Sequence, residues 1–170
     1  VYGDYKISTI EHLLSALAGT GVDNCIIDCD GPEIPIMDGS STQFVFLIQT
    51  AGIVEQNAVK KFVYVTKSVQ VQRDDAVARI KPYDGFRVTF TLEFDHPVYN
   101  KYPHSASIDF SQTSFIREVS RARTFGLMDD LEKLKKMNLA LGANLNNAIG
   151  IGDEDVLNEA NIDEVETCLL

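Results

Sequence analysis

The first part of the chain carries apolar residues at helical spacing. They stand at positions i, i+3, i+4 and i+7, and they are Ile10, Leu13, Leu14 and Leu17. This spacing predicts an amphipathic helix whose apolar stripe faces the core of the protein. Gly19 and Gly21 are expected to end this helix.

Further elements are predicted between residues 25 and 52. Residues 25–29 read as a short strand, and residues 31–40 form a loop rich in proline and glycine. The apolar run 44–51 predicts a second, buried helix, which Gly52 closes.

After Lys60 the apolar period changes from about 3.6 to about 2 residues, which is typical of half-buried antiparallel strands. The strands are predicted at residues 62–65, 69–72, 76–81, 86–94 and 106–110. Ser111 is expected to cap a following helix, and residues 129–137 predict another. This order of elements predicts an α+β fold with layers of helix and sheet and a domain boundary between residues 58 and 59.

The overall composition narrows the range of functions. With 170 residues and 45% hydrophobic residues, the chain can bury a core. A net charge of -10 makes nucleic acid and anionic membranes improbable partners. Three cysteines, with neither a signal peptide nor an apolar span, favour a reduced cytoplasmic setting without a membrane span.

The sharpest local motif is Ser8-Thr9-Ile10-Glu11-His12. A capping box between Ser8 and Glu11 is favoured by about two to one on sequence alone. Helical geometry places His12 about 200° from Ile10, opposite the stripe that we expect to face the core. The first turn of a helix keeps an imidazole neutral, so His12 could also bind a metal, with Glu11 as a general base. A catalytic zinc needs about three protein ligands, and these two residues cannot supply them.

Four segments together resemble a known enzyme family. They are ISTIEHLLSALAG at 7–19, GVDN at 21–24, EIPIMDGS at 33–40 and SRARTFG at 120–126. In this order they resemble the UDP-3-O-acyl-N-acetylglucosamine deacetylases, zinc-dependent hydrolases of lipid A (lipopolysaccharide) biosynthesis, and the similarity extends to residues 156–159. The resemblance implies the α+β deacetylase fold and hydrolysis of the N-acetyl group of an acylated UDP-glucosamine.

The resemblance also implies roles for individual residues. Glu11 would be the general base that activates a zinc-bound water, and His12 would be one of three zinc ligands. Thr124 would donate a hydrogen bond to the oxyanion that forms on the amide carbonyl.

Three further residues receive supporting roles from the resemblance. Phe125 and Leu127 would line the entrance to the passage that holds the acyl chain, although a core position is equally natural for Phe125. Asp38 would be a second-shell group that supports the site, whereas its chemistry alone favours a turn former, because Asp-Gly is a common turn sequence.

The chain also departs from the family pattern. The family carries its other two zinc ligands as a histidine and an aspartate four residues apart on a later helix, and that pair is missing here. Many members have a nucleotide-binding lysine where this chain has Ala76. We therefore expect residues 1–58 to be the later part of an incomplete first domain, and residues 59–170 to be a second domain without its final helix region.

Two functional hypotheses follow. The first is an inactive piece of a zinc-dependent deacetylase, which would bind less zinc than a complete site and show no turnover alone. The alternative is a non-catalytic α+β module or degenerate relative that binds a nucleotide sugar or a protein partner. The residue pattern favours no particular oligomeric state.

Overall fold

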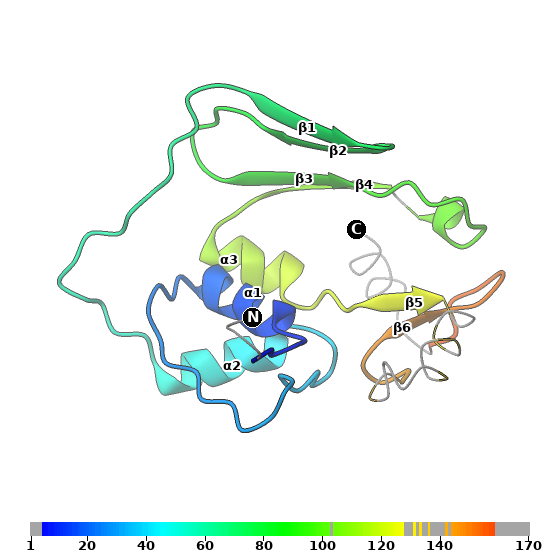
Figure 1. The fold of residues 1–170 in the computed structure, drawn as a ribbon, viewed down its shortest axis with the longest axis horizontal. Coiled ribbons are helices and arrows are strands. Elements are labelled where there is room, and N and C mark those ends of the chain that lie inside the picture. Colours follow the sequence, from blue (N-terminus) through cyan, green and yellow to red (C-terminus); the bar gives the residue numbers. More distant parts are fainter. Residues whose placement is uncertain are drawn as a thin grey trace.

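The computed structural model describes residues 5–102, 104–127, 131, 133, 136, 142 and 144–158. These residues form an α+β fold in which α1, α2 and α3 lie together, the β1–β2 and β3–β4 pairs lie above them, and the β5–β6 pair lies to their right (Figure 1). The elements are α1 (Glu11–Thr20), α2 (Thr42–Ala51), β1 (Val69–Arg73), β2 (Ala76–Ile80), β3 (Arg87–Thr91), η1 (Tyr99–Lys101), β4 (Ser105–Asp109), α3 (Gln112–Ser114), η2 (Phe115–Val119), β5 (Phe125–Leu127) and β6 (Ile149–Ile151). Within the described part of the chain, no helix is both long and apolar enough to cross a membrane.

Helix α1 forms where the apolar spacing predicts it, but it buries a different face. Its fully buried residues are Ala16 and Thr20. The predicted stripe faces the core only in part, because Leu13 packs against the core whereas Ile10 and Leu14 are 43% and 48% exposed. The reason is close packing, because a face of small residues lets neighbouring elements approach the helix backbone.

The closest of these contacts is between Gly19 of α1 and Phe115 of η2. A Cβ atom at position 19 would lie 2.1 Å from the Phe115 ring, so only glycine fits there. The ring completes a core cluster of buried residues from α1, α2, η2 and the loop before α2, which are Ala16, Ile34, Phe44, Val45 and Phe115. This core joins residues from both sides of the predicted domain boundary.

Helix α2 is confirmed, with Gly52 as its C-cap. Its predicted burial is wrong in part, because Phe44 and Val45 are buried while Phe46 and Leu47 are largely exposed. The strands predicted at residues 25–29 and 62–65 are wrong, because neither segment forms a strand in the structure. A strand needs a neighbour to satisfy its backbone hydrogen-bonding groups, and neither segment pairs with another described strand. The segment between α2 and β1 instead runs extended and largely exposed (Figure 1).

The strands predicted at 69–72, 76–81, 86–94 and 106–110 form two antiparallel pairs, β1 with β2 and β3 with β4. The alternation is visible in the β3–β4 ladder, where Val88 faces Ile108, and Thr89 faces Ser107 with their hydroxyls 2.8 Å apart. The expected half-burial is wrong for β1, β2 and β3, whose residues are exposed at every position. In β4 the burial alternates as expected, with Ala106 and Ile108 half-buried between exposed residues.

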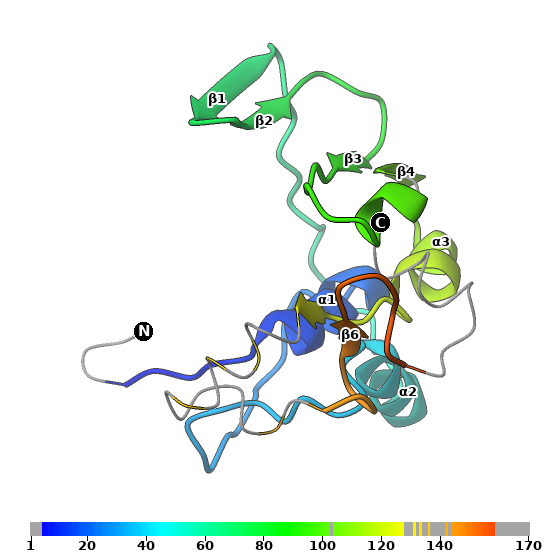
Figure 2. The same ribbon diagram turned by 90° about the vertical axis from the view of Figure 1, so that its right-hand side faces the viewer.

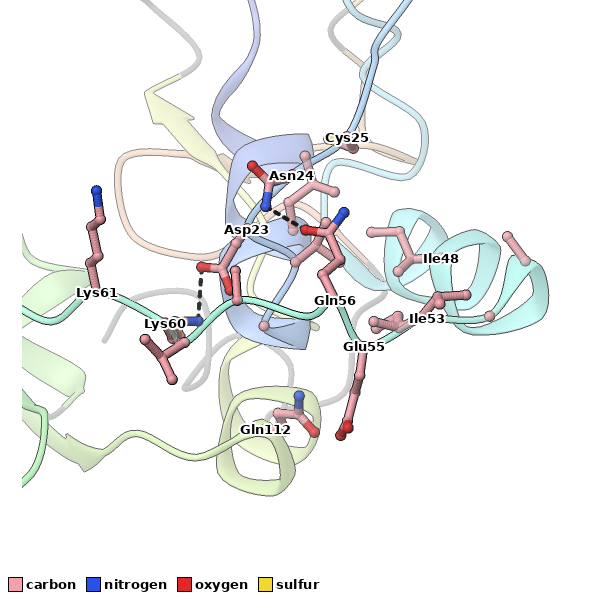
Figure 3. A pocket seen from close by; sticks show the side chains of 18 residues that line it. Asp23, Asn24, Cys25, Ile48, Ile53, Glu55, Gln56, Lys60, Lys61 and Gln112 are labelled. Atoms are coloured by element: carbon pink, nitrogen blue, oxygen red, sulfur yellow. Dashed lines mark hydrogen bonds and ion pairs between the residues drawn. The ribbon is translucent and has the colours of Figure 1, made fainter.

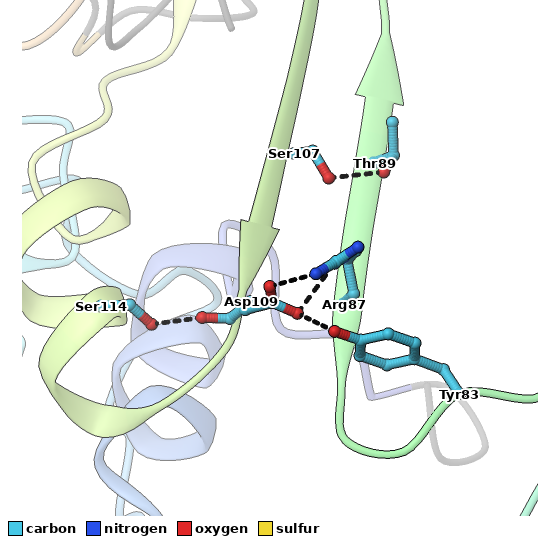
Figure 4. A network of polar contacts seen from close by, with 6 residues as sticks. All are labelled: Tyr83, Arg87, Thr89, Ser107, Asp109 and Ser114. Carbon is cyan, nitrogen blue, oxygen red and sulfur yellow. Dashed lines mark hydrogen bonds and ion pairs between the residues drawn. The ribbon is translucent and has the colours of Figure 1, made fainter.

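A polar network fixes the end of β4 against β3 (Figure 4). The Asp109 carboxylate accepts hydrogen bonds from Arg87 Nε at 2.8 Å and from the Tyr83 hydroxyl at 2.6 Å. These hydrogen bonds, first from Arg87 and then from Tyr83, lower the pKa of Asp109 from 3.8 to about 2. Ser114 donates from its hydroxyl to the Asp109 carbonyl at 2.8 Å, which ties the sheet to α3.

The predicted cap at Ser111 is confirmed. Its hydroxyl accepts from the Ser114 backbone N–H, and the Ser114 hydroxyl accepts in return from the Ser111 backbone N–H. The helix that follows is not regular, because α3 is short and continues as the π-helical turn η2. The helix predicted at 129–137 falls mostly outside the described residues.

Strands β5 and β6 pair in parallel, a pairing that the sequence pattern does not reveal. Each has three residues, which is too short for a visible alternation. They pack with η1 in a second core cluster whose buried members are Val98, Tyr99, Ile149 and Ile151. Packing of Phe125 against this cluster holds the start of β5, which directly follows Thr124.

Candidate functional site

The start of α1 is held by the backbone of a neighbouring loop. The Ser8 N–H donates to the Pro32 carbonyl at 2.9 Å, and the Ile34 N–H donates to the Ser8 carbonyl at 3.1 Å. The Ser8 hydroxyl also donates to the Pro32 carbonyl, at 3.2 Å. The N-cap position is Ile10, which makes no side-chain capping bond. The capping box between Ser8 and Glu11 is therefore wrong, because Ser8 is engaged with the loop.

Glu11 and His12 occupy the first turn of α1. The Glu11 side chain is exposed, and His12 is half-buried. His12, Ala16 and Thr20 are four residues apart in turn, so His12 lies on the buried face, and its predicted place opposite the core is wrong. Neither the Glu11 carboxylate nor the His12 imidazole has a hydrogen bond or ion pair within the described part of the chain, so both are available for other ligands.

Asp38 shapes the turn that leads into α2. Its Oδ1 atom accepts from the Ser40 N–H at 3.1 Å and from the Ser40 hydroxyl at 2.9 Å. The Ser40 hydroxyl oxygen in turn accepts from the Thr42 N–H at 3.1 Å. Asp38 is thus a turn former here, as its chemistry alone predicts.

The same turn is bonded directly to the start of the SRARTFG segment. The Ser120 carbonyl accepts from the Ser41 N–H at 3.1 Å, the Ser41 hydroxyl at 3.0 Å and the Thr42 hydroxyl at 2.9 Å. Ser40, Ser41 and Ser120 are all buried. Two motifs far apart in sequence therefore form one buried polar joint, which sequence reasoning missed.

Thr124 lies four residues after this joint. Its carbonyl accepts from the Ile149 N–H at 2.9 Å, while its side chain is exposed. Its hydroxyl has no hydrogen bond among the residues that the structure describes. The segment from η2 to β5, which carries Thr124, passes beside the N-terminal end of α1 in both views (Figures 1 and 2). No hydrogen bond links the side chains of Glu11, His12 and Thr124 among the described residues, and their grouping into one site is a prediction.

Phe125 and Leu127 are half-buried and pack against the second core cluster. The Phe125 ring meets the Tyr99 ring edge to face, with centroids 5.4 Å apart. Tyr99 is itself a residue that sequence reasoning missed. Its hydroxyl is buried and has no hydrogen-bond partner in the described part of the structure. Burial raises the pKa of Tyr99 to about 12.

The described side chains do not form a metal site. Among the described residues, no group of three His, Cys, Asp or Glu side chains lies close enough to form a metal site. His96 accepts from the Val98 N–H at 3.3 Å and packs against Tyr99, so it is engaged elsewhere. His12 offers a free imidazole, but a single imidazole does not fit a zinc centre.

A cavity of about 1030 Å³ lies at the other end of α1 (Figure 3). It opens between residues 21–25 and 52–61, which are joined by a Lys60–Asp23 ion pair of 3.0 Å and an Asn24–Gln56 hydrogen bond of 2.8 Å. Neither Glu11, His12 nor Thr124 lines this cavity. It is therefore separate from the candidate site.

Comparisons with known proteins agree with the motifs. A family model described as UDP-3-O-acyl N-acetylglycosamine deacetylase matches residues 1–166. The chain is 56% identical over 159 residues to the UDP-3-O-acyl-N-acetylglucosamine deacetylase of Methylococcus capsulatus, covering 94% of this chain and 52% of that relative. The enzymes of that name from Thioalkalivibrio sulfidiphilus and Coxiella burnetii are 54% and 53% identical, covering 94% and 92% of this chain and 52% of each relative. The chain spans about half the length of the curated relatives that it matches.

Proposed function

Because the chain belongs to the UDP-3-O-acyl N-acetylglycosamine deacetylase family, we propose that it supplies part of a deacetylase site of lipid A biosynthesis. The proposed reaction is hydrolysis of the N-acetyl group of a UDP-3-O-acyl-N-acetylglucosamine, which yields acetate and a free amine. One observation carries the proposal. The segment from η2 to β5 runs beside the start of α1 in both ribbon views (Figures 1 and 2), and the Glu11, His12 and Thr124 side chains make no hydrogen bond within the described residues.

Glu11 is the proposed general base. A base must reach the proton of the attacking water, and an exposed carboxylate without a competing cation can do so. Glu11 has this freedom, because it makes no ion pair within the described residues. The backbone N–H groups of the first turn also favour a negative charge at this position.

Thr124 is the proposed donor to the oxyanion. Attack of water on the amide carbonyl places negative charge on oxygen, and a hydroxyl held in advance stabilises that charge. The backbone of Thr124 is held through the bond from the Ile149 N–H, while its hydroxyl stays free. A fixed backbone with a free hydroxyl suits this role.

The proposed cofactor is zinc, with His12 as one ligand. The ion would supply Lewis-acid chemistry at the carbonyl. The described residues contain one candidate ligand for it and do not form a complete zinc centre. His12 suits a ligand role because its imidazole is half-buried and unpaired.

Phe125 and Leu127 are proposed to line the acyl-chain entrance. Both expose part of an apolar side chain while resting on a fixed core, which is what an apolar binding wall requires. Asp38 is proposed to support the site through its hydrogen bonds to Ser40. Its support is indirect, because it orders Ser40 and thereby the turn that binds Ser120.

The division into residues 1–58 and 59–170 remains a proposal. It is supported by the extended, exposed segment between α2 and β1. The shared core around Phe115 means that the two domains would pack against each other. The cytoplasm is the proposed compartment, which suits the free thiols of Cys25 and Cys29.

An exchange enzyme tests the proposed function. The exchange enzyme is the Methylococcus capsulatus relative in which the 159 matched residues of this chain replace their counterparts. We expect it to release acetate from UDP-3-O-acyl-N-acetylglucosamine. A folded exchange enzyme that binds zinc but releases no acetate would contradict the proposal.

A further inference from the structure

Thr9 has a backbone conformation that is unusual for its residue type. Its φ angle is 54°, in the left-handed region that favours glycine. A β-branched side chain is strained there, because its Cβ substituents crowd the backbone. Such strain persists only where the surroundings hold it, and it often occurs at functional sites. Thr9 stands two residues before Glu11.

Two sets of contacts hold this conformation. The Thr9 hydroxyl donates a hydrogen bond to Glu33 Oε1. On the preceding residue, the backbone of Ser8 pairs with Pro32 and Ile34 on either side of Glu33. Ile34 is buried in the core cluster that contains Ala16 of α1. The loop at 32–34 is therefore anchored in the same core as the helix that it orients.

The backbone conformation of Thr9 sets the orientation of the first turn of α1. The N-cap residue Ile10 supplies no side-chain bond that could fix the helix start. The Thr9–Glu33 hydrogen bond is thus the nearest side-chain contact before Glu11 and His12. We propose that Thr9 and Glu33 are positioning residues, which orient Glu11 and His12 toward the segment carrying Thr124.

This inference rests on the proposed function, and it differs from a purely structural role. In a structural role, loss of the Thr9–Glu33 bond lowers stability but leaves the turnover of the folded enzyme unchanged. In a positioning role, substrate binding is retained while the chemical step slows, because the base is misplaced. The split between kcat and KM therefore separates the two.

The test uses the exchange enzyme with Glu33→Ala, Glu33→Gln and Thr9→Val. Glu33→Ala and Thr9→Val should lower kcat by about 10-fold or more, with KM changed by less than about twofold. Glu33→Gln keeps an oxygen that accepts from Thr9 and should restore most of kcat. Thr89→Val is the matched control, because it breaks a threonine hydrogen bond of 2.8 Å to Ser107 in the β3–β4 ladder. It should leave both constants unchanged.

The outcomes separate the positioning role of Thr9 and Glu33 from the proposed function. If the parent exchange enzyme turns over and Glu33→Ala keeps its kcat, the positioning role is overturned while the proposed function stands. An equal loss of kcat in Glu33→Ala and Glu33→Gln also overturns the positioning role, because the acceptor oxygen kept in Glu33→Gln should restore kcat. If the parent enzyme is folded and inactive, the proposed function fails and this inference fails with it.

Discussion

The Thr42 hydroxyl donates a hydrogen bond of 2.9 Å to the carbonyl of Ser120. This contact joins the first residue of α2 to the residue that follows η2, within a buried polar joint. Since Thr124 lies four residues farther along, the joint fixes one end of the segment that carries it. The other end is fixed at Ile149.

Thr42→Val should destabilise the protein by about 1 kcal/mol, because it removes a part-buried hydrogen bond and keeps the side-chain volume. The measurement is urea unfolding of the purified chain. Thr89→Val serves as control and should cost less than about 0.5 kcal/mol, because its hydrogen bond is exposed. Equal losses in the two variants would contradict a special role for the joint.

Gly19→Ala should be destabilising by about 1–3 kcal/mol, because the added methyl group overlaps the Phe115 ring. Gly31→Ala is the matched control, since a Cβ atom there meets nothing within 4 Å. The two unfolding midpoints in urea are compared directly. A Gly19→Ala variant as stable as Gly31→Ala would mean that α1 and η2 do not pack this closely.

The sequence predicted the local elements better than their burial. α1, α2, the two hairpins and the Ser111 cap follow from spacing and residue chemistry. The buried face of α1 could not be read from spacing, because tight packing selects small residues such as Ala16 and Gly19, whereas a hydrophobic stripe selects large ones. The parallel pairing of β5 with β6 depends on contacts distant in sequence, so no local pattern reveals it.

For the candidate site, too, the sequence indicated individual residues but not the tertiary contacts around them. Motifs indicated Glu11, His12 and Thr124, whereas the segments that carry them are held by the joint at Ser120 and the bridge at Ser8, which are tertiary contacts. Ser8 illustrates the difficulty. A capping box is its natural local role, and a distant backbone competes successfully for its hydrogen bonds.

Tyr99→Phe should keep or raise stability, because the lost hydroxyl has no hydrogen bond among the described residues and is costly to bury. Tyr99→Ala should be destabilising by about 3–5 kcal/mol, since it removes a ring packed against Phe94 and Phe125. Thermal and urea unfolding both measure this difference. A large loss in Tyr99→Phe would show that the hydroxyl has a partner in solution.

Acid should weaken the fold partly through Asp109. Its folded pKa of about 2 lies below its ordinary value of 3.8, so its contribution to stability is present above 3.8 and is lost as the pH falls toward 2. Asp109→Asn should therefore flatten the dependence of the unfolding free energy on pH across this window. Asp84→Asn, which removes a nearby charge without breaking the bond to Arg87, should leave the slope unchanged. An unaltered slope in Asp109→Asn would contradict this assignment.

The central claim is that Glu11 and His12, in the first turn of α1, take part in hydrolysis of the substrate. The most direct test measures both turnover and zinc content in variants of the exchange enzyme. Glu11→Ala should lower turnover by about 100-fold or more with zinc content nearly unchanged, whereas His12→Ala should lower both. Each variant must first show an unfolding midpoint close to that of the parent. Full turnover in Glu11→Ala, or equal losses of turnover and of zinc in both variants, would contradict the account.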